Sequence, residues 1–381
     1  MTDKYIELIR EDSPTLNQVA FLNHASTAPL HGRTQQAFYD YLKQWSKYDF
    51  TESREKSQLA REEFAKLIGA TKNEILFTSD VTQGTNLAVH MLDYDEKSNI
   101  VCYWNDYAGQ VHSALFLQKK KKVEYRPVPD RDGYIYPEDF AEKIDNNTKI
   151  VLLSHVQWIT GFKSDIKEIA KIAHENGAMI LVDVIQSSGV LKIDVKDWDI
   201  DFLTSGVAKW LLGPNQAGFF YMRKRFIDEY DPPLPGYQGA DYGSIESPYW
   251  NVKKIEYREG IDKFQISNIG PMMYQIAYEG MKIITDYGIE KVEKRVLDLT
   301  AYLIERIQNL GNYELLSPVE DKYRAGIVNF KVDKNIEIAK KLAEEKIVVS
   351  PRYGGIRISP HFYNTKEDLD KFIETFKSVH K

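Results

Sequence analysis

Residues 180–221 read ILVDVIQSSGVLKIDVKDWDIDFLTSGVAKWLLGPNQAGFFY, and this stretch decides the fold of the chain. It opens within the apolar run 178–182, which is too short for a helix and is bounded by polar residues, so we predict a strand buried on both faces. A second apolar segment ends at Ser205. Open α/β sheets hold their ligands at the carboxyl ends of the strands. The side chains that two such adjacent strands gather in one crevice are Asp183, Gln186 and Lys209.

The group that needs an acid, an amide and a lysine together is pyridoxal 5'-phosphate. The lysine amine binds this cofactor as a Schiff base, and the amide donates a hydrogen bond to the ring oxygen. The carboxylate faces the pyridine nitrogen and keeps it protonated, so that the ring accepts electrons from a substrate carbanion. The three side chains therefore predict a pyridoxal phosphate site.

Two of these residues also have a simpler interpretation when each is taken alone. Asp183 could cap the helix that follows its strand, and most lysines are exposed to solvent. The neighbours of Lys209 between Val207 and Leu212 are all apolar, however. A partly desolvated amine has the lowered pKa that a Schiff-base nucleophile requires. We therefore expect the acid, the amide and the lysine to act together.

The spacing of polar and apolar residues in this block follows the pattern D-x-x-Q, D-x-D-F, S-G-x-x-K-W-L-x-G-P and G-F-x-Y. The pattern resembles the class V aminotransferase family of fold-type I pyridoxal phosphate enzymes, which includes cysteine desulfurases and isopenicillin N epimerase-like proteins. The residues that carry it are Asp183, Gln186, Asp199, Asp201, Phe202, Ser205, Gly206, Lys209, Trp210, Gly213, Pro214, Gly218, Phe219 and Tyr221.

The resemblance extends over residues 19–370 and implies an α/β protein of fold type I. Strands alternate with helices over residues 70–225, which is typical of a largely parallel sheet covered on both faces. We expect a large cofactor-binding domain with a mostly parallel, seven-stranded sheet and a smaller α+β domain. The predicted divisions are an N-terminal segment 1–20, a large domain 21–284 and a C-terminal domain 285–381.

Two further segments resemble family motifs near the cofactor and the substrate. The segment after residue 22 resembles a family loop beside the substrate, so His24 and Ala25 are assigned to substrate binding; His24 could instead be a local hydrogen-bonding residue. A helix start after residue 80 offers backbone N–H groups and a hydroxyl to an anion. By the resemblance, the cofactor phosphate is bound there by the Val81 backbone and Thr82, and Ser205 is also assigned to the cofactor.

Aromatic residues occupy two family positions beside the cofactor ring. Tyr107 stands where the family places a ring-stacking side chain, although an aromatic packed beneath the loop is the alternative. Trp158 stands where desulfurase-like relatives carry an asparagine near the ring oxygen. This departure leaves Gln186, or alternatively Gln157, as the ring-oxygen donor.

Arg352 and Arg357 are five residues apart across a Gly-Gly turn, so both could point into one crevice. The segment resembles the carboxyl-terminal signature of the family, in which an arginine forks the substrate α-carboxylate. Permanent charge and two parallel N–H donors suit arginine for this task. A structural ion pair is the alternative for either residue, and we favour Arg357 as the main ligand.

The resemblance leaves the reaction open among related chemistries. Cysteine desulfurases carry a nucleophilic cysteine between the two arginine positions, and residues 353–356 contain none. Ala208 also replaces the histidine that precedes their lysine, so persulfide formation is disfavoured. We predict an aminotransferase that acts on a small α-amino acid and its 2-oxo acid. A carbon–sulfur lyase acting on cysteine or cystine and an amino-acid epimerase remain alternatives, whereas a non-catalytic scaffold is disfavoured because Lys209 and Asp183 are present.

The family completes each active site with loops of a second subunit, so we expect a homodimer. The corresponding loops are residues 48–54 and 260–267. Ile261 replaces the threonine that reaches the phosphate of the neighbouring subunit in the family, and Ser267 is a candidate substitute.

Composition bounds the remaining possibilities. The net charge of -6 and the pI near 5.9 give no electrostatic case for nucleic acid or for an anionic membrane. The single cysteine, Cys102, excludes an internal disulfide and is consistent with a reducing cytoplasm. Residues 1–14 do not resemble a signal peptide, and no run approaches the roughly 18 apolar residues of a membrane span. We expect a cytoplasmic enzyme, and we assign no residue to a metal.

Overall fold

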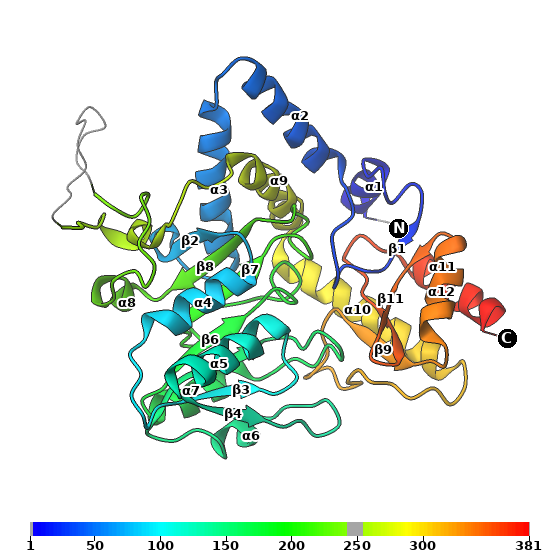
Figure 1. Ribbon diagram of the computed structural model, residues 1–381. Coiled ribbons are helices and arrows are strands. Elements are labelled where there is room, and N and C mark those ends of the chain that lie inside the picture. The colour runs from blue at the N-terminus through cyan, green and yellow to red at the C-terminus, as the bar shows by residue number, and fades with distance from the viewer. Residues whose placement is uncertain (1–2, 242–253, 381) are drawn as a thin grey trace.

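The computed structural model describes residues 3–241 and 254–380, and Figure 1 shows their arrangement. Within these residues the main sheet has seven strands in the order β2-β8-β7-β6-β5-β3-β4. Only β8 runs antiparallel to its neighbours, so the mostly parallel sheet of the predicted α/β fold is confirmed. The strands are β2 (Ile75–Thr78), β3 (Asn99–Tyr103), β4 (Glu124–Val128), β5 (Thr148–Ser154), β6 (Met179–Asp183), β7 (Phe202–Gly206) and β8 (Gly218–Met222).

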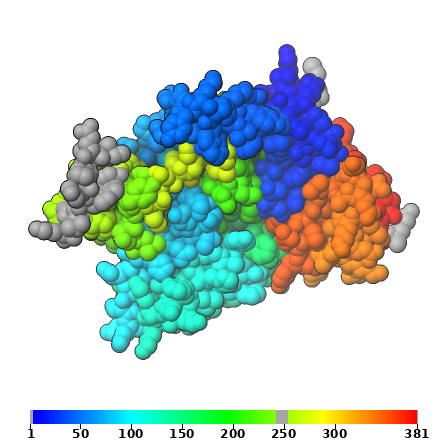
Figure 2. All heavy atoms as spheres, turned by 45° about the horizontal axis from the view of Figure 1, so that its top comes forward, coloured from blue at the N-terminus to red at the C-terminus, as the bar shows by residue number. Residues whose placement is uncertain are grey.

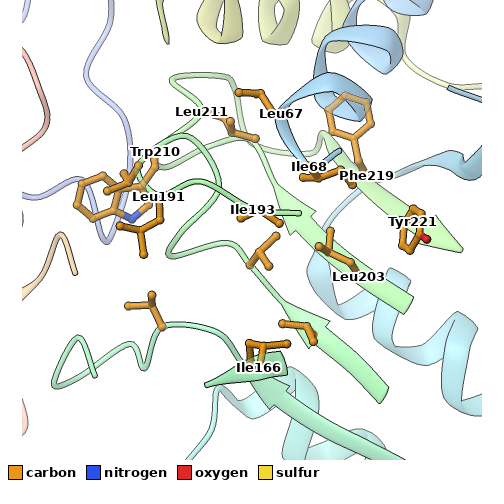
Figure 3. Close-up of a cluster of buried hydrophobic side chains, with 14 of the residues drawn as sticks. Leu67, Ile68, Ile166, Leu191, Ile193, Leu203, Trp210, Leu211, Phe219 and Tyr221 are labelled. Atoms are coloured by element: carbon orange, nitrogen blue, oxygen red, sulfur yellow. The ribbon is translucent and has the colours of Figure 1, made fainter. Parts of the chain in front are cut away.

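Alternate residues of the central strands enter two different hydrophobic cores. In β6, Ile180 and Val182 join the core beneath one face of the sheet, and Leu181 joins the core on the other face. A strand packed on both faces needs apolar residues at successive positions, which explains the continuous apolar run of the sequence. Figure 3 shows the first core, in which Leu203 of β7 and Phe219 of β8 lie among apolar side chains.

Helices cover both faces of this sheet. Residues of α4 and α5 contribute to one core, and residues of α3, α7 and α9 contribute to the other. Helix α7 shows how the sequence sets helix limits: the Asp165 carboxylate accepts from the Glu168 N–H at its start, and Gly177 follows its end with φ of 76°. The helices of this part are α3 (Thr51–Leu67), α4 (Val81–Met91), α5 (Ala108–Lys121), α6 (Pro137–Ala141), α7 (Ile166–Glu175), α8 (Lys224–Glu229) and α9 (Pro271–Tyr287), with short 3-10 helices η1 (Lys72–Glu74) and η2 (Gly260–Phe264).

The C-terminal part forms a separate α+β layer. Its sheet has the order β11-β12-β9, and both pairings are antiparallel. The sequence also suggests a strand over 313–316, and this is wrong: Leu315 makes only an isolated bridge to Phe330. The ladder is irregular there because the N–H groups of Leu316 and Ser317 both donate to the Asn329 carbonyl. The elements are α10 (Ile289–Gln308), β9 (Val328–Lys331), α11 (Asn335–Glu344), β10 (Ile347–Val348), β11 (Ser350–Arg352), β12 (Gly355–Ile358) and α12 (Lys366–Val379).

The N-terminal residues contact this C-terminal part directly. After α1 (Lys4–Glu11), the short strand β1 (Ala20–Phe21) pairs in parallel with β10, and α2 (Gly32–Ser46) follows. Leu22 belongs to the same hydrophobic cluster as Val328 and Ile358. Figure 2 shows the two ends of the chain in contact, dark blue against orange. The loop after β1 is thereby held between the two parts of the molecule, while the domain limits given above stay predictions.

Across residues 3–241 and 254–380, none of the helices combines the length and the apolarity that a membrane crossing requires.

Candidate active site

Asp183 ends β6 in the middle of the sheet, and its side chain is 1% exposed. Its Oδ1 accepts a hydrogen bond from the Ile185 N–H at 2.8 Å. Its Oδ2 is buried and has no hydrogen-bond partner. Burial raises the pKa of Asp183 to about 7, the negative charge of Asp106 adds to the rise, and the Lys209 amine opposes it. An acid in this setting has one oxygen free for a ligand that carries a proton.

Lys209 lies in the tight loop that follows β7. The Gly213 N–H returns to the Val207 carbonyl at 2.9 Å, which closes this loop around the lysine. Burial lowers the pKa of Lys209 to about 8, and the charges of Arg357 and Arg352 also lower it, whereas Asp183 raises it. The structure therefore brings together the acid and the lysine that the sequence predicts for one crevice, and it places both arginines near the same amine.

Tyr107 presents its ring above this amine. The Lys209 Nζ lies 5.6 Å from the ring centroid, and the Trp158 ring meets Tyr107 edge-on at 6.0 Å. The side chain is 46% exposed, so it is not packed beneath its loop. The exposed aromatic face agrees with the predicted stacking on a planar cofactor, which stays a prediction.

Gln186 connects two loops of the site through its carboxamide. Its Nε2 donates to the Ala25 carbonyl at 3.0 Å, and its Oε1 accepts from the Trp210 indole at 2.9 Å. The carboxamide nitrogen carries a second N–H, which the predicted contact with a cofactor ring oxygen would use. The competing candidate, Gln157, uses its carbonyl oxygen to accept from the N–H groups of Ile159 and Thr160, which shapes its own turn.

Val81 and Thr82 are the first two residues of α4, as an anion site at a helix start requires. Thr82 is exposed, and its hydroxyl lies against α5: a Cβ added to Gly109 would meet Thr82 Oγ1 at 2.7 Å. The glycine therefore allows the starts of α4 and α5 to approach each other. The Asp80 carboxylate accepts from the Gln83 N–H and leaves the first N–H groups of α4 for a phosphate.

Ser205 and His24 differ from this picture because their side chains are buried within the protein. The Ser205 hydroxyl is 2.7 Å from the Ser188 hydroxyl and donates to the Gly206 carbonyl. The His24 Nδ1 contacts the Ser359 carbonyl at 2.8 Å, and its Nε2 contacts the Tyr363 hydroxyl. Both contact sets are internal, so they give no support to a cofactor role for Ser205 or a substrate contact for His24.

His24 instead packs against residues that surround the site. Its ring stacks on that of Trp210 with centroids 5.8 Å apart, and burial holds its pKa well below the usual range. The next residue, Ala25, donates its N–H to the Ser359 hydroxyl and accepts from Gln186. This segment matches the alternative given above, a local hydrogen-bonding role, and it fixes the loop on which Ser26 stands.

Arg357 on β12 is 2% exposed and reaches across the molecule. Its Nη1 donates to the Trp158 carbonyl and its Nη2 to the Ser26 hydroxyl, both at 2.6 Å, while its buried Nε has no partner. Burial, and to a smaller extent the charge of Arg352, lowers the pKa of Arg357 to about 9. Sequence reasoning missed Ser26, which no motif marks.

Neither arginine forms an ion pair with a carboxylate of the described residues, although most other arginines there do. Arg352 donates only to the carbonyl of the adjacent Pro351. The structural ion pair that competed with substrate binding is therefore absent from residues 3–241 and 254–380. A buried guanidinium without an acid favours an incoming anion, such as a substrate carboxylate.

The arrangement fits the cofactor that the sequence predicts. Asp183 has a free buried oxygen, Lys209 has a lowered pKa, and Tyr107 leaves a ring face open. The buried Arg357 has no carboxylate partner among the described residues, as its predicted contact with a substrate carboxylate would require. Fold and site together define a pyridoxal phosphate-dependent enzyme that acts on an amino acid.

The sequence matches the Aminotransferase class-V family over residues 20–372, and the chain belongs to that family. It is 28% identical over 379 residues to the uncharacterized aminotransferase YcbU of Bacillus subtilis (strain 168), covering 98% of this chain and 99% of the relative. It is 25% identical to a probable cysteine desulfurase of Methanothermobacter thermautotrophicus, covering 98% of each. The predicted family is thus confirmed.

Solved structures share the fold. The apo cysteine desulfurase from Thermococcus onnurineus NA1 has a TM-score of 0.89 and 23% identity, covering 100% of this chain and 99% of that one. The cystine C-S lyase C-DES, in complex with its product cysteine persulfide, has a TM-score of 0.85 and 21% identity, covering 95% of this chain and 98% of that one. At these identities the likeness concerns the fold alone.

Proposed function

We propose that the protein is an aminotransferase of the class V type that uses Lys209 as its Schiff-base lysine and acts on a small α-amino acid. The observation that carries the proposal is the unpaired oxygen of Asp183, which interacts electrostatically with the Lys209 amine, together with the exposed Tyr107 ring on which that amine lies. The relative named as an aminotransferase supports the reaction type.

Bound pyridoxal phosphate supplies an electron sink for the charge left at Cα when a proton is removed. Asp183 Oδ2, which has no partner within the protein, would accept the hydrogen bond of the protonated ring nitrogen. Lys209 Nζ would accept the proton from Cα and deliver it to a different carbon, as the transfer of the amino group requires, and its lowered pKa suits it to both steps near neutral pH. Val81 and Thr82 would bind the phosphate, and Gln186 would donate to the ring oxygen.

The substrate is oriented by its carboxylate. Arg357 has donors bound to the Trp158 carbonyl and to Ser26, so the position of its guanidinium is fixed before any ligand arrives. A fixed cation spends little entropy on binding and sets which face of Cα meets Lys209. Arg352, on the paired strand, is the second candidate for this contact.

A carbon–sulfur lyase is the second candidate function, and an epimerase is the third. Several relatives are named cysteine desulfurases, yet the turn between β11 and β12 contains no cysteine. Elimination of a sulfur leaving group, like transamination, needs Lys209 as the proton carrier. The lyase reaction therefore remains compatible with the residues of this site.

The test is a scan of single amino acids with the purified holoenzyme, without an added 2-oxo acid. A transaminase forms one equivalent of 2-oxo acid per site and no ammonia or sulfide. A lyase turns over repeatedly on cysteine or cystine with release of sulfur, and an epimerase inverts Cα without either product. Repeated sulfur release with no half-transamination would overturn the aminotransferase proposal, and the Lys209→Ala variant is the inactive control.

We also propose that two copies form the active unit. One face of α2 and the segment just beyond its end carry exposed apolar side chains, which is unusual for a monomer surface. They are Phe38, Tyr39, Leu42, Trp45 and Tyr48. An adjoining pocket of about 450 Å³ lies between α2 and the Leu212–Asn215 segment, immediately after Lys209. A fully active monomer in light scattering at assay concentration would contradict the dimer.

Ile261, which stands in place of the family threonine, cannot supply its hydroxyl, and its side chain is buried in the core. A separate pocket of about 360 Å³ is lined by Arg54, Arg258 and Ser267 among other polar residues. In the proposed dimer these donors are available to the phosphate of a neighbouring subunit. Finally, we propose a cytoplasmic location, with which the single buried cysteine is consistent.

A further inference from the structure

A second buried carboxylate lies beside the proposed cofactor acid. Asp106, in the loop between β3 and α5, is 6% exposed. Its Oδ2 accepts from the Ser154 N–H at 2.7 Å. Its Oδ1 accepts from the Ser154 hydroxyl at 2.5 Å and from the Tyr107 N–H at 2.6 Å. Both oxygens of Asp106 are therefore engaged, whereas one oxygen of Asp183 is free.

These bonds join three elements of the site. Ser154 ends β5 and pairs in register with Asp183, the last residue of β6. Tyr107 is the N-cap residue of α5, and its backbone N–H is held by Asp106. The Asp106 carboxylate thus ties the loop that carries the Tyr107 ring to the strand next to the cofactor acid.

We propose that Asp106 is a positioning residue of the active site, which anchors Tyr107 above Lys209 and places a second negative charge beside Asp183. The inference rests on the proposed function, because Asp106 acts through two residues whose roles depend on the cofactor.

We infer the anchoring role of Asp106 because the Tyr107 ring has few other contacts that fix its position. The ring is nearly half exposed, and its neighbours there are the edge of Trp158 and the amine of Lys209. An exposed side chain takes its position mainly from its backbone. The short bond from the Tyr107 N–H to a carboxylate that is itself bound twice by Ser154 fixes that backbone.

The charge of Asp106 acts on Asp183, whose strand partner Ser154 binds the Asp106 carboxylate. Asp106 and Lys209 are the charged groups that act on Asp183, in opposite directions. Arg352 and Arg357 face Lys209 in turn. The other groups that feel Asp106 are Cys102, Tyr103 and Tyr125, none of which is charged at neutral pH. A second negative charge therefore favours a protonated ring nitrogen and a protonated Schiff base nearby.

Two variants separate the anchor from the charge. Asp106→Asn removes the charge and weakens the clamp, whereas Ser154→Ala removes one bond and keeps the charge. Asp145→Asn is the matched control, because Asp145 binds Asn99 and Arg126 near the opposite ends of β3 and β5. Each holoenzyme is examined for the Kd of pyridoxal phosphate by equilibrium dialysis and for the pH midpoint of the visible absorbance of the bound cofactor.

Asp106→Asn should raise this Kd about tenfold, the usual effect of losing a charge-assisted hydrogen bond, and move the midpoint to lower pH. Ser154→Ala should weaken binding less and leave the midpoint in place, and Asp145→Asn should change neither. An unchanged Kd and an unchanged pH midpoint in Asp106→Asn would overturn the inference. So would a midpoint shift in Ser154→Ala as large as that expected for Asp106→Asn, because Ser154→Ala keeps the charge. The Ser154→Ala variant also provides the test if Asp106→Asn does not fold. Failure of the unaltered protein to bind the cofactor would instead overturn the proposed function.

Discussion

The two ends of the central sheet bury acidic side chains in opposite ways. At the amino ends, Asp201 is 0% exposed, and its carboxylate accepts from His174 at 2.7 Å and from the Ile180 N–H at 3.0 Å. Arg223 also lies 3.4 Å from Asp201. At the carboxyl ends, Asp183 is as deeply buried and leaves Oδ2 without a partner.

The difference separates structure from function within one sheet. A buried acid with a full set of partners holds the strands together, whereas an unpaired one destabilises the fold and persists where a ligand completes it. Arg357 is a second example, because its buried Nε has no hydrogen-bond partner and no carboxylate of residues 3–241 and 254–380 pairs with it. The unpaired Asp183 oxygen and the uncompensated Arg357 guanidinium both belong to the proposed site at the carboxyl ends of the strands, and the following experiments compare the two ends of the sheet.

Lys209→Ala, at the carboxyl ends of the strands, should have the largest effect. The cofactor loses its covalent attachment and the substrate loses its proton carrier, so kcat should fall by about 10³-fold or more. Borohydride reduction followed by peptide mass spectrometry should locate the cofactor on Lys209 in the unaltered protein. Lys171→Ala, on the exposed face of α7, is the control. Label on another lysine would remove the assignment.

Asp183→Ala should have the next largest effect. A neutral pyridine stabilises the Cα carbanion poorly, so kcat should fall by roughly 10²-fold while the KM for the amino acid changes much less. Cofactor retention should also weaken. Steady-state kinetics on the best substrate of the amino-acid scan provide the measurement, and a near-normal kcat would show that the site is drawn wrongly.

The same residue makes a prediction about the cofactor-free protein. The folded-state pKa of Asp183 is raised to about 7, above the value near 4 of an unfolded aspartate, so the folded state retains a proton that the unfolded state releases. This contribution to stability is complete below pH 4 and is lost as the pH rises to about 7. As the pH rises from 4 to 7, the free energy of unfolding measured in denaturant titrations should therefore fall less for Asp183→Asn than for the unaltered protein.

Arg357→Ala should act on binding more than on chemistry. Loss of a charge-assisted hydrogen bond typically costs about 1.5–3 kcal/mol, so the KM for amino acids should rise by roughly tenfold to a hundredfold while the visible spectrum of the holoenzyme stays the same. Arg352→Ala is the matched comparison from the paired strand, and we expect a smaller rise. Normal KM values in both variants would leave the substrate carboxylate without its proposed ligand.

His174→Gln, near the amino ends of the strands, should have the smallest effect on activity. The pKa of His174 is raised chiefly by its hydrogen bond to Asp201, so its stabilising contribution is complete below about pH 6 and is lost as the pH rises through the folded-state pKa. We expect the free energy of unfolding to fall by about 1–2 kcal/mol at pH 6 and to change little at pH 9, while kcat per folded molecule stays the same. A large loss of kcat would contradict the assignment of a structural role to the acid at the amino ends of the strands.

Sequence by itself determined the strand–helix alternation and the central residues of the site. Buried parallel strands need unbroken apolar runs, and the crevice at their carboxyl ends receives whatever polar residue follows each run, which is how Asp183 and Lys209 could be assigned. The arginines came from a local motif as well. These features are visible because period and position along one segment encode them.

Only the tertiary structure decided which polar side chains are free. His24 is paired with Ser359 and Tyr363, residues more than three hundred positions away, and Ser205 is paired with Ser188. No local pattern announces such partners. Asp106 was missed for the same reason, since an acid after a strand shows its role only when β5 and β6 lie beside it. The availability of a hydrogen-bonding group depends on every neighbour in space, and the sequence states the group without its neighbours.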